Sequence, residues 1–223
     1  MVSPWLGMGL VLGALGGTAA GLRRFQCRRR PHPETVRKLF HVAGGVVCLG
    51  LPWLFDDPRP VAALTGIATL GFLVIRLARP LRRTIGSVVH AVARPSLGDL
   101  GFPLGVGLLF VLSDGEPLRF GVPVLVLTFA DPAATLVGMR WGHHTYATLD
   151  GRKSLEGSSA FFVVALLCAA IPLLVLAHAG CVEALTVAAL LALALTAVEA
   201  VAWRGLDNLL IPLAGFVGLE ILL

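Results

Sequence analysis

The chain has little charge for its size. Only 14% of its 223 residues are Asp, Glu, Lys or Arg, whereas 57% are hydrophobic, and the mean hydropathy is +0.86. Soluble globular domains carry about 25% charged residues, so this composition excludes a soluble domain and predicts an integral membrane protein. A chain of this length can cross a bilayer several times, because each helical crossing takes about 17–25 apolar residues.

Three common signatures are also missing. The four cysteines are scattered, with no C-x-x-C pair and no histidine at metal-ligand spacing, so we expect them to act as small apolar residues. No G-x-x-x-x-G-K-[ST] motif occurs, which excludes a Walker A loop. No convincing internal repeat is present, which counts against a transporter built from inverted repeats.

Long apolar segments dominate what is present. We interpret eight of them as candidate transmembrane helices, the fourth and the last being short: 3–22, 39–55, 60–78, 100–113, 120–139, 158–178, 184–203 and 208–223. The sequence therefore predicts an all-α, polytopic integral membrane protein with seven or eight transmembrane helices, forming one catalytic domain over residues 1–223. No Lys or Arg precedes the first segment, so we expect it to stay as a helix rather than act as a signal peptide.

Glycines recur every four residues in the first segment, a pattern typical of close helix packing. We expect residues 1–22 to serve packing only. A homo-oligomer formed through this face is possible, and the sequence leaves the oligomeric state open. Basic residues alternate from loop to loop: an eight-helix topology puts only Arg59 and Arg119, of 18 Lys and Arg residues, on one side. Because cytoplasmic loops collect Lys and Arg, we predict an amino terminus outside and catalytic loops in the cytoplasm. The net charge of +5 then indicates anionic lipid heads rather than nucleic acid.

Acidic side chains lie within the apolar segments, on the side that this topology makes cytoplasmic. Asp131 precedes Met139, the expected helix end, by eight residues and is therefore about 12 Å deep at 1.5 Å per residue. Pro132 follows directly and can open the helix locally. Glu199 lies about one turn deep on the same side. Such groups are costly within a membrane and therefore indicate function.

Polar side chains at several helix ends should converge on this cytoplasmic face. They are His41, Glu156, Asp207, Asn208 and the loop residue Lys153. Carboxylate and amide oxygens suit Mg²⁺, which substrate phosphates usually complete. Lys153 could contact those phosphates as a point charge, and Arg37 and Lys38 could do the same. The sequence thus predicts an active site for Mg²⁺ and a phosphate-bearing substrate at the cytoplasmic face.

Each candidate also has a purely structural explanation. Asp131 could be a packing acid that pairs with a buried polar partner, and His41 could be a packed polar residue. Ser154 and Glu156 are both favourable near a helix amino terminus and could cap the sixth segment. The Lys and Arg residues could be cytoplasmic anchors, and the acids near helix ends could be solvated.

Four blocks resemble the membrane family of CTP-dependent lipid kinases, which includes phytol kinase, dolichol kinase and CTP-dependent diacylglycerol kinase and is related to the phosphatidate cytidylyltransferases. The blocks are ETVRKLFHVAGG (34–45), SLGDLGFPLG (96–105), ADPAATLVGMRWG with GRKSLEGSSAFF (130–162), and VEAVAWRGLDNLLIPL (198–213). They occur in the family order and span most of the chain from Glu34 onward, and the third block is the most specific.

The resemblance implies a kinase that transfers the γ-phosphoryl group of CTP, with Mg²⁺, to the hydroxyl of a membrane lipid alcohol. An isoprenoid alcohol such as phytol, farnesol or polyprenol is preferred, and diacylglycerol is an alternative. The implied catalytic residues are Asp131, Lys153, Glu156 and His41; the implied nucleotide-binding residues are Arg37, Lys38, Lys153, Ser154 and Asn208; the implied metal ligands are Asp131, Glu199 and Asp207. CDP-lipid synthesis from phosphatidate and a membrane transporter are the two alternative functions.

Overall fold

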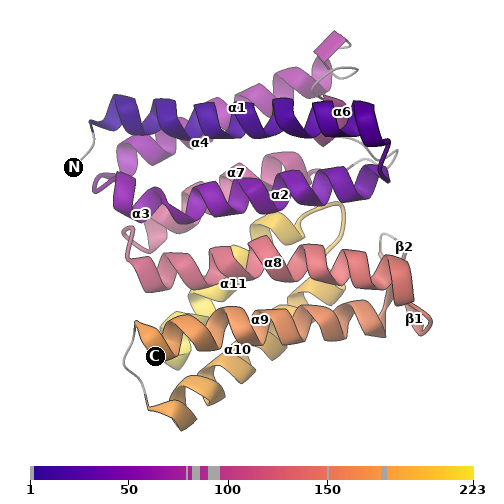
Figure 1. Cartoon of the computed structure of the whole chain (residues 1–223). Coiled ribbons are helices and arrows are strands. Elements are labelled where there is room, and N and C mark those ends of the chain that lie inside the picture. Colours follow the sequence, from indigo (N-terminus) through magenta and orange to yellow (C-terminus); the bar gives the residue numbers. More distant parts are fainter. Residues whose placement is uncertain (1–2, 79, 82–85, 90–95, 150, 177–179) are drawn as a thin grey trace.

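The structure is a computed structural model that describes residues 3–78, 80–81, 86–89, 96–149, 151–176 and 180–223. Each of the eight apolar segments coincides with a helix of at least 15 residues, so the all-α prediction is confirmed (Figure 1). These helices are α1 (Pro4–Arg29), α2 (Pro33–Leu49), α4 (Pro58–Leu77), α7 (Gly98–Leu112), α8 (Pro117–Trp141), α9 (Leu155–Val175), α10 (Cys181–Val201) and α11 (Asp207–Leu222). The short elements are α3 (Leu51–Leu54), α6 (Gly86–Val89), β1 (Thr145–Thr148) and β2 (Gly151–Ser154).

Five of the described helices are long and apolar enough to cross a membrane, namely α1, α4, α8, α9 and α10. The chain is therefore a multi-pass membrane protein. Helices α2, α7 and α11 have 17, 15 and 16 residues, so the total of seven or eight crossings stays a prediction. Four basic residues used for the predicted topology lie outside the described residues: Arg79, Arg82, Arg83 and Arg94.

The two ends of the bundle differ. Both chain termini lie at the end opposite the β hairpin (Figure 1). Arg119 near the start of α8 pairs with Glu220 near the end of α11, with Nε and Oε1 3.1 Å apart, so the start of α8 lies beside the carboxyl terminus. The hairpin end carries the end of α8 and the start of α9 (Figure 1). That the hairpin end faces the cytoplasm stays a prediction.

Helix α8 forms the centre of the bundle and packs against α9, α2 and α11, while α7 lies between α4 and α11. Glycines permit the closest approaches: a Cβ at Gly45 of α2 would collide with Thr128 of α8, and a Cβ at Gly107 of α7 with Thr65 of α4. Helix α8 stays helical through Pro132. Pro132 has no backbone N–H to donate within the helix, so the expectation that it can open α8 locally stays a prediction.

The segment that contains Lys153, interpreted above as a loop residue, is an antiparallel hairpin. Strands β1 and β2 pair with Tyr146 opposite Lys153 and Thr148 opposite Gly151. The Tyr146 hydroxyl lies 2.7 Å from the Ser158 hydroxyl on the first turn of α9, which ties the hairpin to that helix. The strand pairing therefore fixes Lys153 at the hairpin end of the bundle.

Helix α1 extends to Arg29, seven residues beyond its predicted end, and its glycine face is uncovered. A Cβ at Gly9, Gly13 or Gly17 would meet no described atom of the chain within 4 Å. The expected packing of these glycines on another helix therefore does not occur within the described part of the chain, and a homo-oligomer that covers them stays a prediction.

Candidate active site

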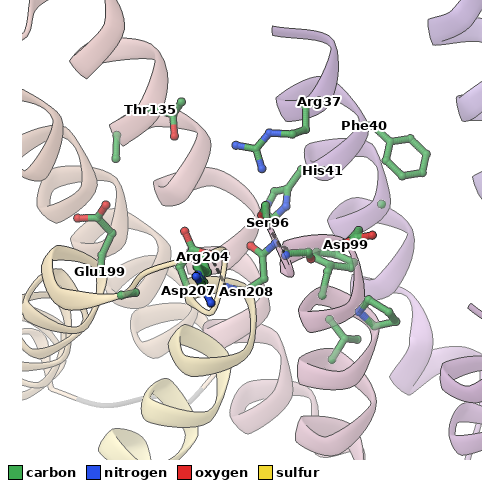
Figure 2. Close-up of a pocket in the computed structure, with 18 of the residues that line it drawn as sticks. Arg37, Phe40, His41, Ser96, Asp99, Thr135, Glu199, Arg204, Asp207 and Asn208 are labelled. Carbon is green, nitrogen blue, oxygen red and sulfur yellow. Dashed lines mark hydrogen bonds between the residues drawn. The ribbon is translucent and has the colours of Figure 1, made fainter. Parts of the chain in front are cut away.

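One large cavity, about 1330 Å³ in volume, runs between α1, α2, α4 and α7 and reaches β2, α10 and α11. Its lining is divided. Charged and amide side chains gather at one end, and those used below come from six elements: Arg37, Arg76, Asp99, Lys153, Glu199, Asp207 and Asn208. In Figure 2, Arg37 and His41 of α2 face Asp207 and Asn208 of α11, and Glu199 of α10 lies to one side of this group. We call this end the polar end of the cavity.

Lys38 and Asp131 form a buried ion pair between α2 and α8. The Lys38 ammonium donates to both oxygens of the Asp131 carboxylate, at 2.8 and 2.7 Å, and the two side chains are each about 5% exposed. Neither residue lines the cavity among the described side chains. The pairing alternative considered for Asp131 is thus the arrangement found. Metal ligation by this acid would require Lys38 to move away.

His41 links this pair to the cavity. Its Nε2 lies 2.8 Å from the Leu127 carbonyl oxygen and 3.6 Å from Oδ2 of Asp131, and its ring packs edge-on against Phe102. Because a carbonyl oxygen can only accept, Nε2 carries the proton and donates it. The other ring nitrogen, Nδ1, is then the acceptor of the neutral imidazole. His41 lines the cavity, so it is suited to accept a proton there.

Arg37 belongs to the same face of α2 as His41, four residues away, and also lines the cavity. Its Nε donates to Glu34 at 2.8 Å. The guanidinium also interacts electrostatically with Asp131 and Asp207, and it extends into the polar end in Figure 2. The remaining N–H donors of its planar group suit a phosphate.

Lys153 enters the polar end from β2 and pairs with Glu199 on the last turn of α10. Its ammonium lies 2.6 Å from Oε1 of Glu199 and also contacts the Glu199 backbone carbonyl. The Lys153 side chain is 24% exposed, and it lines the cavity. A partly exposed ammonium can exchange this partner for a phosphate oxygen. The hairpin therefore places the predicted lysine where it can contact a ligand.

The α10–α11 turn positions Asp207 and Asn208. Arg204 and Gly205 adopt left-handed backbone conformations, with φ of 52° and 80°, and this tight turn starts α11 directly behind α10. Asn208 Nδ2 donates to the Gly98 carbonyl at 2.8 Å, and a Cβ at Gly98 would collide with that amide nitrogen. Block 96–105 thus provides close contact for block 198–213.

Ser154 and Glu156 lie at the amino-terminal end of α9 and form hydrogen bonds there. Ser154 Oγ accepts from the Gly157 backbone N–H at 3.1 Å, so it caps α9, and it also lines the cavity. Glu156 accepts from the His144 backbone N–H at 3.1 Å, and its Oε1 lies 2.8 Å from His144 Nδ1. Glu156 does not line the cavity among the described residues. The structure therefore separates this predicted catalytic acid from the polar end and places it at the base of the hairpin.

Sequence patterns did not predict two charged residues of the cavity lining as site residues. Arg76, at the end of α4, donates to the Ser96 carbonyl at 2.9 Å and pairs with Asp99 of α7 at 3.4 Å. Both line the polar end. Arg76 was interpreted only as a cytoplasmic anchor, and Asp99 within SLGD also fits a turn. Arg76 and Asp99 are 23 positions apart in sequence, and their pairing depends on the contact between α4 and α7.

The residues of the polar end fit a divalent cation that is completed by a substrate. Glu199 Oε2 and Asn208 Oδ1 are buried and have no hydrogen-bond partner within the described structure, and Asp207, next to Asn208 on α11, lines the same cavity. Within the described ranges, no three His, Cys, Asp or Glu side chains form a metal site by themselves. Mg²⁺ commonly uses one or two carboxylates together with substrate phosphates and water, so the donor set is compatible with Mg²⁺.

Comparison with known proteins identifies a clear relative. Phytol kinase from Synechocystis sp. is 33% identical to the chain over 214 residues, which cover 94% of this chain and 88% of that protein. No family model matches the chain. No solved structure matches it.

Proposed function

The chain belongs to the family of CTP-dependent lipid kinases that includes phytol kinase, and from this we propose that it transfers the γ-phosphoryl group of CTP to the hydroxyl of a membrane lipid alcohol, an isoprenoid alcohol in preference to diacylglycerol. The observation that carries the proposal is the convergence of Arg37, Lys153 and Asp207 at one end of a cavity whose other end is lined mainly by apolar side chains. Phosphoryl transfer asks a protein mainly to position the reactants and to offset their charge.

The cations would offset the charge of the nucleotide. Lys153 exchanges Glu199 for a phosphate oxygen, and Arg37 offers a planar fork of donors from the opposite wall. Ser154 and Asn208 line the same end and supply neutral hydrogen-bonding groups. These contacts would stabilise the transition state most, because negative charge on the transferred group develops there and electrostatic interactions are stronger where water is excluded.

Mg²⁺ would be held by Asp207 and Glu199, with the amide oxygen of Asn208. When bound, it would offset negative charge on the phosphate oxygens. Asp131 contributes differently in this proposal: its pairing with Lys38 and its 3.6 Å approach to His41 Nε2 hold both residues in place. Direct ligation by Asp131 follows only if Lys38 turns toward the nucleotide.

His41 would accept the proton of the lipid hydroxyl. Its Nε2 is committed to Leu127, so Nδ1 is the atom that receives the proton, and the nearby Asp131 carboxylate stabilises the imidazolium that forms. Glu156 keeps the hairpin in register through His144 and so acts on Lys153 indirectly.

Labelled CTP tests this function directly. Purified protein in detergent is given Mg²⁺ and CTP labelled at either the α or the γ phosphate, with phytol, farnesol, a polyprenol, diacylglycerol and phosphatidate as separate acceptors. We expect γ label in the lipid product and no α label. Transfer of α label to phosphatidate would identify a cytidylyltransferase instead, and no lipid-dependent transfer from CTP would contradict the proposal.

A further inference from the structure

The cavity continues well beyond the polar end as a passage that we call the apolar arm, lined by Val11, Leu15, Cys48, Val61, Ala68 and Val106. No described side chain that lines this arm is charged. The one hydroxyl on the α4 wall, Thr65 Oγ1, is satisfied by the Val61 carbonyl at 2.9 Å, so it needs no partner from a ligand. The arm therefore suits an uncharged hydrocarbon group.

An aromatic collar separates the arm from the polar end. It consists of Phe40 of α2, Phe72 of α4 and Phe102 of α7, all of which line the cavity. The Phe40 and Phe72 rings meet edge to face with centroids 6.4 Å apart, and Phe102 packs against His41 in the same way at 5.0 Å. A ligand that reaches His41 from the arm passes the level of these three rings, because each lies between the polar end and the arm along its own helix.

The length of the arm can be measured along α4. Arg76 lines the polar end and Val61 lines the far end, and the two are 15 positions apart, hence about 22 Å at 1.5 Å per residue. The part beyond Phe72 covers 11 positions, about 16 Å. This is close to half of the roughly 30 Å hydrocarbon core, the depth that one extended lipid tail reaches.

Helix α1 supplies one wall of the arm. Val11, Leu12 and Leu15 line it, and Leu15 lies opposite Gly44 of α2, where a Cβ would be 3.8 Å from the leucine. The absence of a side chain at Gly44 keeps this part of the arm wide. Helix α1 therefore does more than pack: without it, the arm would be open to the lipid along this side.

We propose that the apolar arm binds the hydrocarbon tail of the lipid alcohol, with the tail running from the aromatic collar toward Val61 and Cys48 and the hydroxyl at His41. The proposal rests on the proposed function for the identity of the head group. It adds that α1, α2, α4 and α7 enclose the tail within the protein, so that the depth of the arm decides which chain lengths are accepted.

A matched pair of substitutions on α4 tests the arm. Ala68 lines it, whereas Ala63 on the same helix is exposed and does not line the cavity. Ala68→Trp should lower kcat/KM for phytol by about tenfold or more relative to geraniol, which has a much shorter tail, because the indole fills the arm partway along. Ala63→Trp should leave this ratio unchanged. Equal losses for both alcohols in Ala68→Trp, or no loss for either, would overturn the proposal.

Alkylation of Cys48 gives a measurement that needs no turnover. Cys48 lines the arm, and Cys181 is exposed at the start of α10, so it is an internal control in the same molecule. Phytol should slow the reaction of Cys48 with a small maleimide, read by peptide mass spectrometry, without affecting Cys181. Geraniol should protect Cys48 less, because Cys48 lies 11 positions beyond Arg37, about 16 Å along α2.

The two measurements separate this proposal from the proposed function. If phytol protects Cys48 of the wild-type protein but no alcohol is phosphorylated, the tail site is supported and the proposed kinase function is contradicted. A protein that phosphorylates phytol while Cys48 reacts at the same rate with and without it would contradict the tail site alone.

Discussion

Lys38 of α2 holds both carboxylate oxygens of Asp131 in α8, at 2.8 and 2.7 Å, and this pair is buried between the two helices. The pairing explains how an acid is tolerated deep in an apolar helix, because its charge is matched inside the bundle. It also positions the neighbouring His41, whose ring nitrogen lies 3.6 Å from the same carboxylate. The ion pair and the proton acceptor therefore form one unit.

The first prediction concerns the stability of this unit. Lys38→Met or Asp131→Asn alone should lower the free energy of unfolding by about 3–5 kcal/mol, because each leaves a buried charge without its partner. The double variant should lose clearly less than the sum. Unfolding of the four proteins in detergent micelles, followed by circular dichroism, measures this coupling. Additive losses would show that the two side chains act independently.

The second prediction concerns the cation. Glu199→Gln should raise the Mg²⁺ concentration needed for half-maximal turnover by about tenfold or more, because Oε2 loses its charge. Glu183→Gln is the matched control, since Glu183 is exposed in the first turn of the same helix. Binding of Mn²⁺ to the nucleotide-loaded protein, followed by electron paramagnetic resonance, should weaken in the first variant only. Equal Mg²⁺ requirements in both variants would exclude Glu199 as a ligand.

The third prediction concerns Lys153. Lys153→Ala should lower kcat by about 10²–10³-fold, because a cation beside the transferred group stabilises the transition state more than the ground state. Arg140→Ala removes a cation near the end of α8 that stacks on Trp141 and lies outside the cavity. This substitution should change kcat by less than about twofold in the same assay. Comparable effects of the two substitutions would mean that Lys153 acts only through overall charge.

The fourth prediction concerns the close contact between α7 and α11. A Cβ at Gly105 would lie 2.5 Å from the Asn208 backbone carbonyl oxygen, whereas a Cβ at Gly66 of α4 meets nothing within 4 Å. Gly105→Ala should therefore shift α11, displace Asn208 and lower both the midpoint of thermal unfolding and kcat. Gly66→Ala should leave both unchanged or raise the midpoint. A harmless Gly105→Ala would show that α11 can move without cost.

The sequence alone located most of the fold. Apolar runs in lipid must become helices, because the backbone can satisfy its hydrogen bonds only within itself, and all eight predicted segments are helical. The hairpin was not predicted: its strands have four residues each, too few for a periodic pattern, and their pairing is what positions Lys153. Glu156 looked equivalent to Lys153 in sequence, yet it contacts His144 instead of the cavity.

The sequence by itself determined the membrane class, the positions of the helices and the group of polar residues from which the site is built, because composition and hydropathy act locally along the chain. The tertiary structure alone decided which of those residues share a cavity. Asp131 is neutralised by Lys38, Asp207 and Asn208 line the same cavity as Glu199, and α1 forms a wall of the apolar arm. These pairings join residues that are distant in sequence, so they depend on how the helices pack.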